Sequence, residues 1–227
     1  MRQLFSSSPA SMLKFSSVSI VALLLSACGG GGGEAGGIAA VNAQPMSFSA
    51  APTLAAAPAS LPQSGGANVC ENVRFGDRDI ENLRVPDGAI CVLEAGVRID
   101  GNLELGTASE LYARGIRVGG NVQGQRAATV LLEDSAVGGN VQLDIGRAVT
   151  VRANTVGGSI QLVQNTGPIF VLANVVDSDV QLFENAGSAE ARDNRVDGNL
   201  QCKENQPAPT GGGNVVQGNK EDQCARL

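Results

Sequence analysis

The sequence predicts an all-β fold, a single-stranded parallel β-helix in which one chain winds through stacked coils. Three observations predict it. A Gly-Asn dipeptide or a close variant recurs every 19 or 20 residues. Apolar and polar residues alternate around it, as they do along a strand with one buried face. Asparagines recur at the same step. These features predict about seven coils of three short strands each, wound right-handed because parallel crossover connections have that hand.

The Gly-Asn positions set the register of the repeat. The aligned pairs are Gly101-Asn102, Gly120-Asn121, Gly139-Asn140, Gly158-Ser159, Ser178-Asp179, Gly198-Asn199 and Gly218-Asn219. A β-branched residue stands two positions before each pair, and an apolar residue follows nearly every one. A second strand repeats at the same step, with inward residues Leu111, Val130, Val149, Ile169 and Ala189. A propeller blade needs about 40 residues per unit, and the Leu-x-x-Leu-x-Leu spacing of leucine-rich repeats is absent.

Two further sets of asparagines recur one coil apart. They are Asn154, Asn174, Asn194 and Asn214 in one set, and Asn165, Asn185 and Asn205 in the other. Asparagine tolerates a left-handed backbone, and its amide can bond both its own turn and a copy stacked above it. The sequence therefore predicts asparagine ladders at the turns.

The first residues have the pattern of an export signal, with a basic start, an apolar run at 18–25 and the ending Leu25-Ser26-Ala27-Cys28. That ending resembles the lipobox of bacterial lipoproteins, which implies cleavage of residues 1–27 and lipid attachment to Cys28. The alternative is a simple signal peptide cut near Ala27. Because Gly29 follows the cysteine where lipoproteins retained in the inner membrane often carry Asp, the resemblance favours the outer membrane of the cell envelope.

Residues 28–66 are mainly Gly, Ala, Ser and Pro, a composition that predicts a disordered tether. The β-helix domain is expected over residues 67–227. The charged stretch 71–81 is expected to cap its first coil. The run 207–213 and the charged residues 220–222 are expected to cap the last.

Four cysteines follow Cys28, an even number that predicts two disulfides in an exported chain. Spacing alone permits three connectivities. The predicted coil length selects one of the three connectivities, because Cys70 and Cys91 are about one coil apart, as are Cys202 and Cys224. Stacked strands lie about 4.8 Å apart, within the range of disulfide geometry. One disulfide is therefore expected at each end, with Cys202 in an inward position that other coils fill with leucine.

Composition narrows the function classes. The formal charge of −6 disfavours nucleic acid as a partner, and the absence of histidine removes the commonest general base and metal ligand. No cofactor is expected. The expected partners are the membrane, through the N-terminal lipid, and a glycan or a protein.

Stacked acids are the candidates for chemistry. Asp177 with Asp197, and Glu184 with Glu204, are each one coil apart, close to the carboxylate separation of a retaining glycosidase. Asp177, Asp179 and Asp197 are the candidates for a calcium site. The simpler interpretation is a solvated acidic surface, because any solenoid with surface acids contains such pairs.

The outward side of the second strand carries Tyr112, Leu131 and Phe170. Exposed, these three residues would form an apolar stripe for a partner. The alternative is that a loop or the long tether covers them.

Two segments resemble uncharacterised bacterial secreted or lipoprotein β-helix proteins. They are VPDGAICVLEAGVRIDGNLEL at 85–105 and GNLQCKENQPAPTGGGNVVQGNKEDQC at 198–224. The resemblance implies the fold and export, and no catalytic residues. The coil length is also similar to that of bactofilins, which are cytosolic polymers.

The function expected from the sequence is a lipid-anchored envelope β-helix that binds or scaffolds without catalysis. The alternatives are a polysaccharide-active lyase or hydrolase acting on acidic glycans, and a self-assembling envelope scaffold.

Overall fold

The structure is a computed structural model that describes residues 56–62, 66 and 68–227. Cys28 and the export signal lie outside the described residues, as does most of the expected tether. The described part of the chain forms 24 strands and no helix, so none of it forms a helix that could cross a membrane.

The strands form three parallel sheets of eight strands each. Sheet 1 contains β1 (Val73–Phe75), β4 (Ile90–Leu93), β7 (Glu110–Arg114), β10 (Thr129–Glu133), β13 (Ala148–Arg152), β16 (Ile169–Leu172), β19 (Ala189–Arg192) and β22 (Thr210–Gly212). Sheet 2 contains β2 (Arg78–Ile80), β5 (Val97–Ile99), β8 (Arg117–Val118), β11 (Ala136–Val137), β14 (Thr155–Val156), β17 (Val175–Val176), β20 (Arg195–Val196) and β23 (Val215–Val216). Sheet 3 contains β3 (Leu83–Val85), β6 (Leu103–Leu105), β9 (Val122–Gln125), β12 (Val141–Asp144), β15 (Ile160–Val163), β18 (Val180–Phe183), β21 (Leu200–Lys203) and β24 (Lys220–Asp222).

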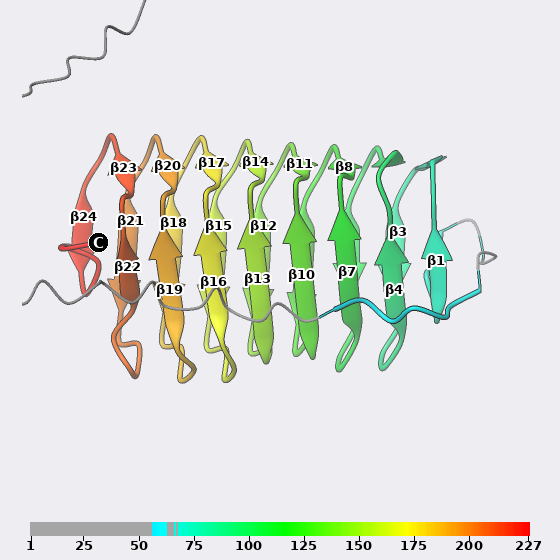
Figure 1. Cartoon of the computed structure of the whole chain (residues 1–227), viewed down its shortest axis with the longest axis horizontal. Helices are drawn as coiled ribbons and strands as arrows, with labels where there is room; N and C mark the ends of the chain where they lie inside the picture. The colour runs from blue at the N-terminus through cyan, green and yellow to red at the C-terminus, as the bar shows by residue number, and fades with distance from the viewer. Residues whose placement is uncertain (1–55, 63–65, 67) are drawn as a thin grey trace, which may run out of the picture. The chain divides into compact units, whose positions relative to one another are not determined.

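Each strand pairs with the strand one coil further on, so the chain is the predicted parallel β-solenoid (Figure 1). It has eight coils, one more than predicted. The extra coil comes from the stretch 71–81, which contains β1 and β2 in place of the expected cap. Its charges face outward, whereas Val73, Phe75 and Ile80 are buried. The expected C-terminal cap residues 220–222 likewise form β24, and the run 207–213 contains most of β22.

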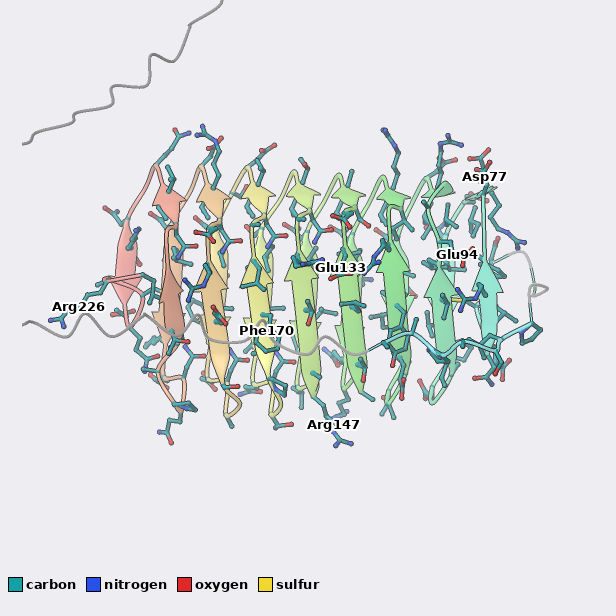
Figure 2. All side chains as sticks on the ribbon, viewed as in Figure 1. Asp77, Glu94, Glu133, Arg147, Phe170 and Arg226 are labelled. Atoms are coloured by element: carbon teal, nitrogen blue, oxygen red, sulfur yellow. A yellow bond between two sulfur atoms is a disulfide. The ribbon has the colours of Figure 1, made fainter. Side chains whose placement is uncertain are left out.

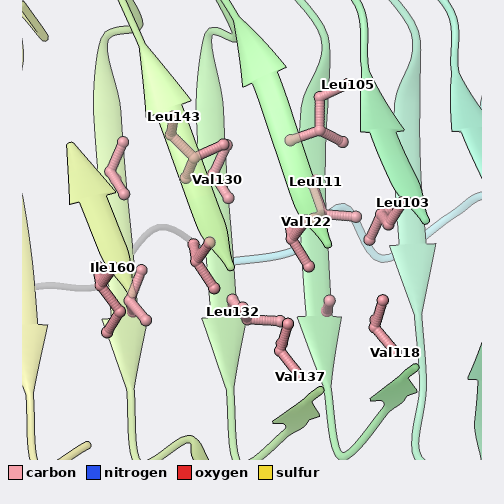
Figure 3. Close-up of a cluster of buried hydrophobic side chains, with 14 of the residues drawn as sticks. Leu103, Leu105, Leu111, Val118, Val122, Val130, Leu132, Val137, Leu143 and Ile160 are labelled. Atoms are coloured by element: carbon pink, nitrogen blue, oxygen red, sulfur yellow. The ribbon is translucent and has the colours of Figure 1, made fainter. Parts of the chain in front are cut away.

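The core is a column of aliphatic side chains enclosed by the three sheets (Figure 3). Residues at matching positions of successive coils stack on one another, as Leu111 does with Val130, and Val122 with Val141. Both predicted inward rows are buried in almost every coil. Because each layer is small, the column needs aliphatic residues of similar size and few rings, which explains the low aromatic content.

The predicted asparagine ladders are present and buried. In the first ladder Asn174 Oδ1 accepts hydrogen bonds from the backbone N–H of Asn154 (3.0 Å) and from its Nδ2 (3.1 Å). Asn174 Nδ2 in turn donates to Val151 O and to Asn194 Oδ1. The second ladder, at Asn165, Asn185 and Asn205, repeats this pattern. Each side chain therefore joins its own coil to the coils on both sides.

The left-handed backbone is not where the sequence analysis expected it. The residue before each ladder asparagine has the positive φ, as at Ala153 (55°), Ala173 (54°) and Glu184 (54°), and the asparagines themselves do not. The left-handed residue turns the chain sharply, and this turn directs the next side chain into the stack. Such a conformation costs about 1–2 kcal/mol in a residue with a Cβ atom, so the asparagine bonds offset a local strain.

A third ladder lies at the Gly-Asn turn between sheets 2 and 3. The side-chain oxygen of each rung accepts the backbone N–H of the rung one coil later, as Asn102 does from Asn121 at 2.8 Å. Glycine precedes most rungs because the coils approach closely: a Cβ atom on Gly139 would lie 2.4 Å from Asn121 Oδ1. The dipeptide that defined the repeat is therefore a contact between coils.

The two predicted disulfides are formed in the structure. The Cα atoms of Cys70 and Cys91 are 5.4 Å apart, and those of Cys202 and Cys224 are 5.1 Å apart. Cys202 is fully buried in register with Leu182, as predicted. The first disulfide joins the chain just before β1 to β4, and the second joins β21 to the turn after β24.

Replacing a buried rung tests the ladders. We expect Asn174→Ala to lower the free energy of unfolding by about 2–4 kcal/mol, because the backbone N–H and the Nδ2 of Asn154 lose their shared acceptor in a buried site. Urea unfolding followed by circular dichroism measures the loss. Asn140→Ala is the matched control, since its ladder is exposed and water can replace the bond, and its loss should stay below about 1 kcal/mol. Equal losses in the two variants would contradict the assigned role.

Candidate functional site

The outward face of sheet 1 carries the stripe predicted from the sequence. Tyr112 pairs in register with Val92 on one side and with Leu131 on the other. Thr150, Phe170 and Glu190 continue the row through the next three coils. Tyr112 is only 8% exposed and Leu131 7%, although both side chains point away from the solenoid core. Phe170, labelled in Figure 2, is half-buried.

A segment of the N-terminal region covers the first part of this row. Residues 56–62, sequence AAPASLP and here called the strap, cross sheet 1 near β1, β4 and β7 (cyan in Figure 1). Val92, Tyr112 and Leu131 form one cluster, which we call the apolar patch, and Leu61 of the strap packs against this cluster. The structure therefore places Tyr112 and Leu131 beneath a segment of the sequence region expected to be a tether.

Arg74 of β1 binds two backbone carbonyl groups of the strap. Its N–H donates to Pro62 O at 2.8 Å, and its guanidinium Nη2 donates to Pro58 O at 2.7 Å. The same guanidinium forms an ion pair with Glu94, with 2.6 Å between Nη1 and Oε1. Ordering a residue costs about 1–2 kcal/mol of backbone entropy. A seven-residue strap with one apolar anchor and these two bonds is therefore far less firmly held than a coil.

Tyr112 is the single tyrosine of the chain, which has no tryptophan. Its hydroxyl donates to Glu110 Oε2 at 2.8 Å. Burial, together with this bond and the nearby negative charge of Glu110, raises the pKa of the Tyr112 phenol to about 12. The neutral phenol is therefore the form that fits beneath the strap.

A buried carboxylate lies on the same face. Glu133, labelled in Figure 2, lies at the end of β10, and its side chain is fully buried between Arg114 and Arg152 of the neighbouring coils. Arg152 Nε donates to Glu133 Oε1 at 2.9 Å, and Arg114 Nε donates to Oε2 at 3.1 Å. These bonds raise the pKa of Arg114 above its usual value. The row Arg114–Glu133–Arg152 is an ion-pair ladder, and both of its arginines remain partly exposed.

The aspartates proposed as a metal or catalytic site lie at the turn between sheets 2 and 3. Asp179 is a rung of the exposed ladder, and its Oδ1 accepts the backbone N–H of Asn199 at 2.6 Å. Asp197 Oδ1 accepts from the side chain of Gln217 at 2.6 Å. Asp177 occupies the position one coil before Asp197, as the register of β17 and β20 requires. Among the described residues no group of three or more metal-ligating side chains is arranged to hold an ion.

Glu184 and Glu204 occupy the left-handed position before two ladder asparagines, with φ of 54° and 56°. Glu184 Oε2 accepts from Gln164 Nε2 at 2.8 Å, and Glu204 forms an ion pair of 3.6 Å with Lys203. Both carboxylates are exposed. They are one coil apart because they occupy the same position in equivalent turns of two successive coils.

A shallow depression of about 470 Å³ lies on the outward face of sheet 3. Its lining includes the carboxylates of Asp87, Glu104 and Asp144 and several glutamines. Gly124, beside the depression, stands at the inward position that other coils fill with leucine, and a Cβ atom there would lie 2.8 Å from Leu105 Cβ. These groups can hydrogen-bond to hydroxyls or cations, and no ring lines the depression.

Sequence reasoning missed the strap and the Glu133 ladder. The ladder had a detectable signal, because Arg114 and Arg152 stand 19 residues before and after Glu133. The strap had a weaker one, a single leucine between prolines in a stretch of small residues. Comparison of the chain with protein-family models, with curated proteins and with solved structures gives no match.

Removing the buried carboxylate should destabilise the solenoid. We expect Glu133→Ala to lower the free energy of unfolding by about 1–3 kcal/mol, because the charged hydrogen bonds from Arg114 and Arg152, which join three coils through one buried carboxylate, are lost. Asp79→Ala is the control: it breaks an exposed pair with Arg98 and should cost less than about 1 kcal/mol. Denaturant midpoints of the two variants give the comparison, and losses of equal size would contradict the buried ladder.

The raised pKa of Tyr112 predicts how the stability of the fold depends on pH. A phenol of ordinary pKa, about 10, ionises two pH units below the pKa of about 12 expected in the fold. Stabilisation by neutral Tyr112 is therefore complete below pH of about 10 and is lost as pH rises through about 12. Because the chain has one tyrosine, ultraviolet absorbance of tyrosinate follows this group alone. A midpoint near 10 in the native protein would contradict the covered site.

Proposed function

We propose that this chain is a lipid-anchored protein of the bacterial cell envelope, and that its β-solenoid acts as a non-enzymatic binding or structural module. The sequence supports the anchor through the Leu25-Ser26-Ala27-Cys28 ending after an apolar run. The two end disulfides support an oxidising compartment, since such bonds are rare in the cytosol.

The use of the acidic side chains is the observation that carries the non-enzymatic assignment. Asp179 accepts a backbone N–H of the next coil, and Asp197 and Glu184 accept from glutamine side chains of neighbouring coils. A catalytic acid–base pair needs two carboxylates placed in different environments, so that one is protonated while the other is charged. The candidate acids are exposed or half-buried, and Asp179, Asp197 and Glu184 serve as hydrogen-bond acceptors between coils, which suits a structural surface.

Self-assembly through the coil ends is less well supported. Open sheet edges at both ends would be needed for copies to stack. At the N-terminal end β3 already pairs with the chain before the first coil, where Cys70 N donates to Arg84 O at 2.9 Å. Arg74 of β1 donates to Pro62 of the strap. These contacts occupy part of the edge that another copy would need.

The anchor is tested by labelling the full chain with a fatty-acid probe in a bacterial host. We expect the wild-type chain to carry the label and to sediment with membranes, and Cys28→Ser to lose both properties. Gly33→Ser, a change of similar size outside the motif, should keep both. Labelled, membrane-bound Cys28→Ser protein would refute the lipid anchor.

The enzymatic alternative is tested with the purified protein and a panel of acidic polysaccharides, by assay for new reducing ends and unsaturated products. We expect no turnover. If the wild-type protein cleaves a glycan and alanine at positions 177, 179, 184, 197 and 204 abolishes the cleavage with the fold retained, the non-enzymatic assignment is wrong.

A further inference from the structure

The strap does not fill the surface beneath it. A cavity of about 500 Å³ remains, lined by Ala56 and Ala57 of the strap and, from sheet 1, by residues that include Val92, Tyr112 and Leu131. Native interiors are packed with few voids larger than a water molecule. The two alanine side chains are too short to reach the floor of this cavity. Leu61 is therefore the principal apolar anchor of the strap, and the site has room for a larger side chain.

The contacts made by the strap are those of an extended peptide in a recognition site. Two backbone carbonyls, those of Pro58 and Pro62, accept bonds from one arginine. One leucine side chain packs against the apolar patch. The two prolines restrict φ and reduce the entropy lost on docking. None of these contacts requires the peptide to be joined to the solenoid.

We propose that the Val92–Tyr112–Leu131 patch is a docking surface for an extended leucine–proline peptide, and that the chain's own strap is the resident ligand that covers it. The strap belongs to the same chain as the patch, so its local concentration there is high and it binds in preference to free peptides. Release of the strap uncovers the apolar patch. The proposal concerns the solenoid alone and holds whether or not Cys28 carries a lipid.

The single tyrosine makes the docking measurable in the full-length chain. Leu61→Ser removes the apolar anchor without altering a coil. We expect acrylamide quenching of Tyr112 fluorescence to rise several-fold in this variant, and the phenol to titrate at lower pH than in the wild type. Ala59→Ser is the matched control, since Ala59 lies in the strap but is exposed, and it should behave as the wild type. Unchanged circular dichroism verifies that the coils remain folded.

Docking in trans is tested by adding the synthetic peptide AAPASLP to the Leu61→Ser chain. We expect saturable recovery of the protection of Tyr112, and none with a peptide in which serine replaces leucine. A peptide with leucine at the position of Ala57 should bind about tenfold more tightly, because the cavity accepts the larger side chain. Wild-type quenching in Leu61→Ser would overturn the proposal, as would the absence of saturable binding at millimolar peptide.

Discussion

The buried asparagine side chains satisfy the hydrogen bonds that the turns between sheets would otherwise leave open. Backbone groups within the strands pair from coil to coil, but a sharp turn removes a residue from this pairing. At these points the side chain of Asn174 accepts the backbone N–H of Asn154 and donates to Val151 O, both in the preceding coil. It also donates to Asn194 of the following coil. The left-handed residue ahead of each asparagine makes that geometry reachable. The length of the coil is therefore fixed by the turns as much as by the aliphatic core.

The sequence alone was sufficient to predict the structural features that repeat from coil to coil. Alternating aliphatic residues, the Gly-Asn turn, the asparagine ladders and the disulfide pairs all follow from one step of 19 or 20 residues. The first coil was missed because its turns lack the Gly-Asn signal and its charges resemble a cap, although Phe75 and Ile80 point inward. The strap has no periodicity, and its position depends on one leucine meeting a patch built by three coils. The Glu133 ladder could have been found by comparing charges one coil apart.

Spacing is a poor guide to chemistry in a solenoid of this kind. Stacking places every residue about 4.8 Å from its equivalent in the next coil, so any two acids at equivalent positions approach the separation of catalytic carboxylates. The surroundings of each carboxylate distinguish one acid from another better than spacing does. Glu133 is buried between two arginines, whereas Glu184 and Glu204 are exposed at a turn. The candidate acids at the turns are exposed or half-buried, and their hydrogen bonds and ion pairs join coils or neighbouring side chains.

The three outward faces differ in a way that explains where the strap lies. Sheet 2 has strands of only two residues from β8 onward and offers little surface. The central outward row of sheet 3 is charged at both ends and consists of glutamines between them, from Gln123 to Gln201. Sheet 1 brings three apolar side chains together on its outward face in adjacent coils, at Val92, Tyr112 and Leu131. A segment with a single leucine can dock at one such patch. Because Thr150 and Glu190 interrupt the row further along, the anchoring position lies in the coils nearest to the strap.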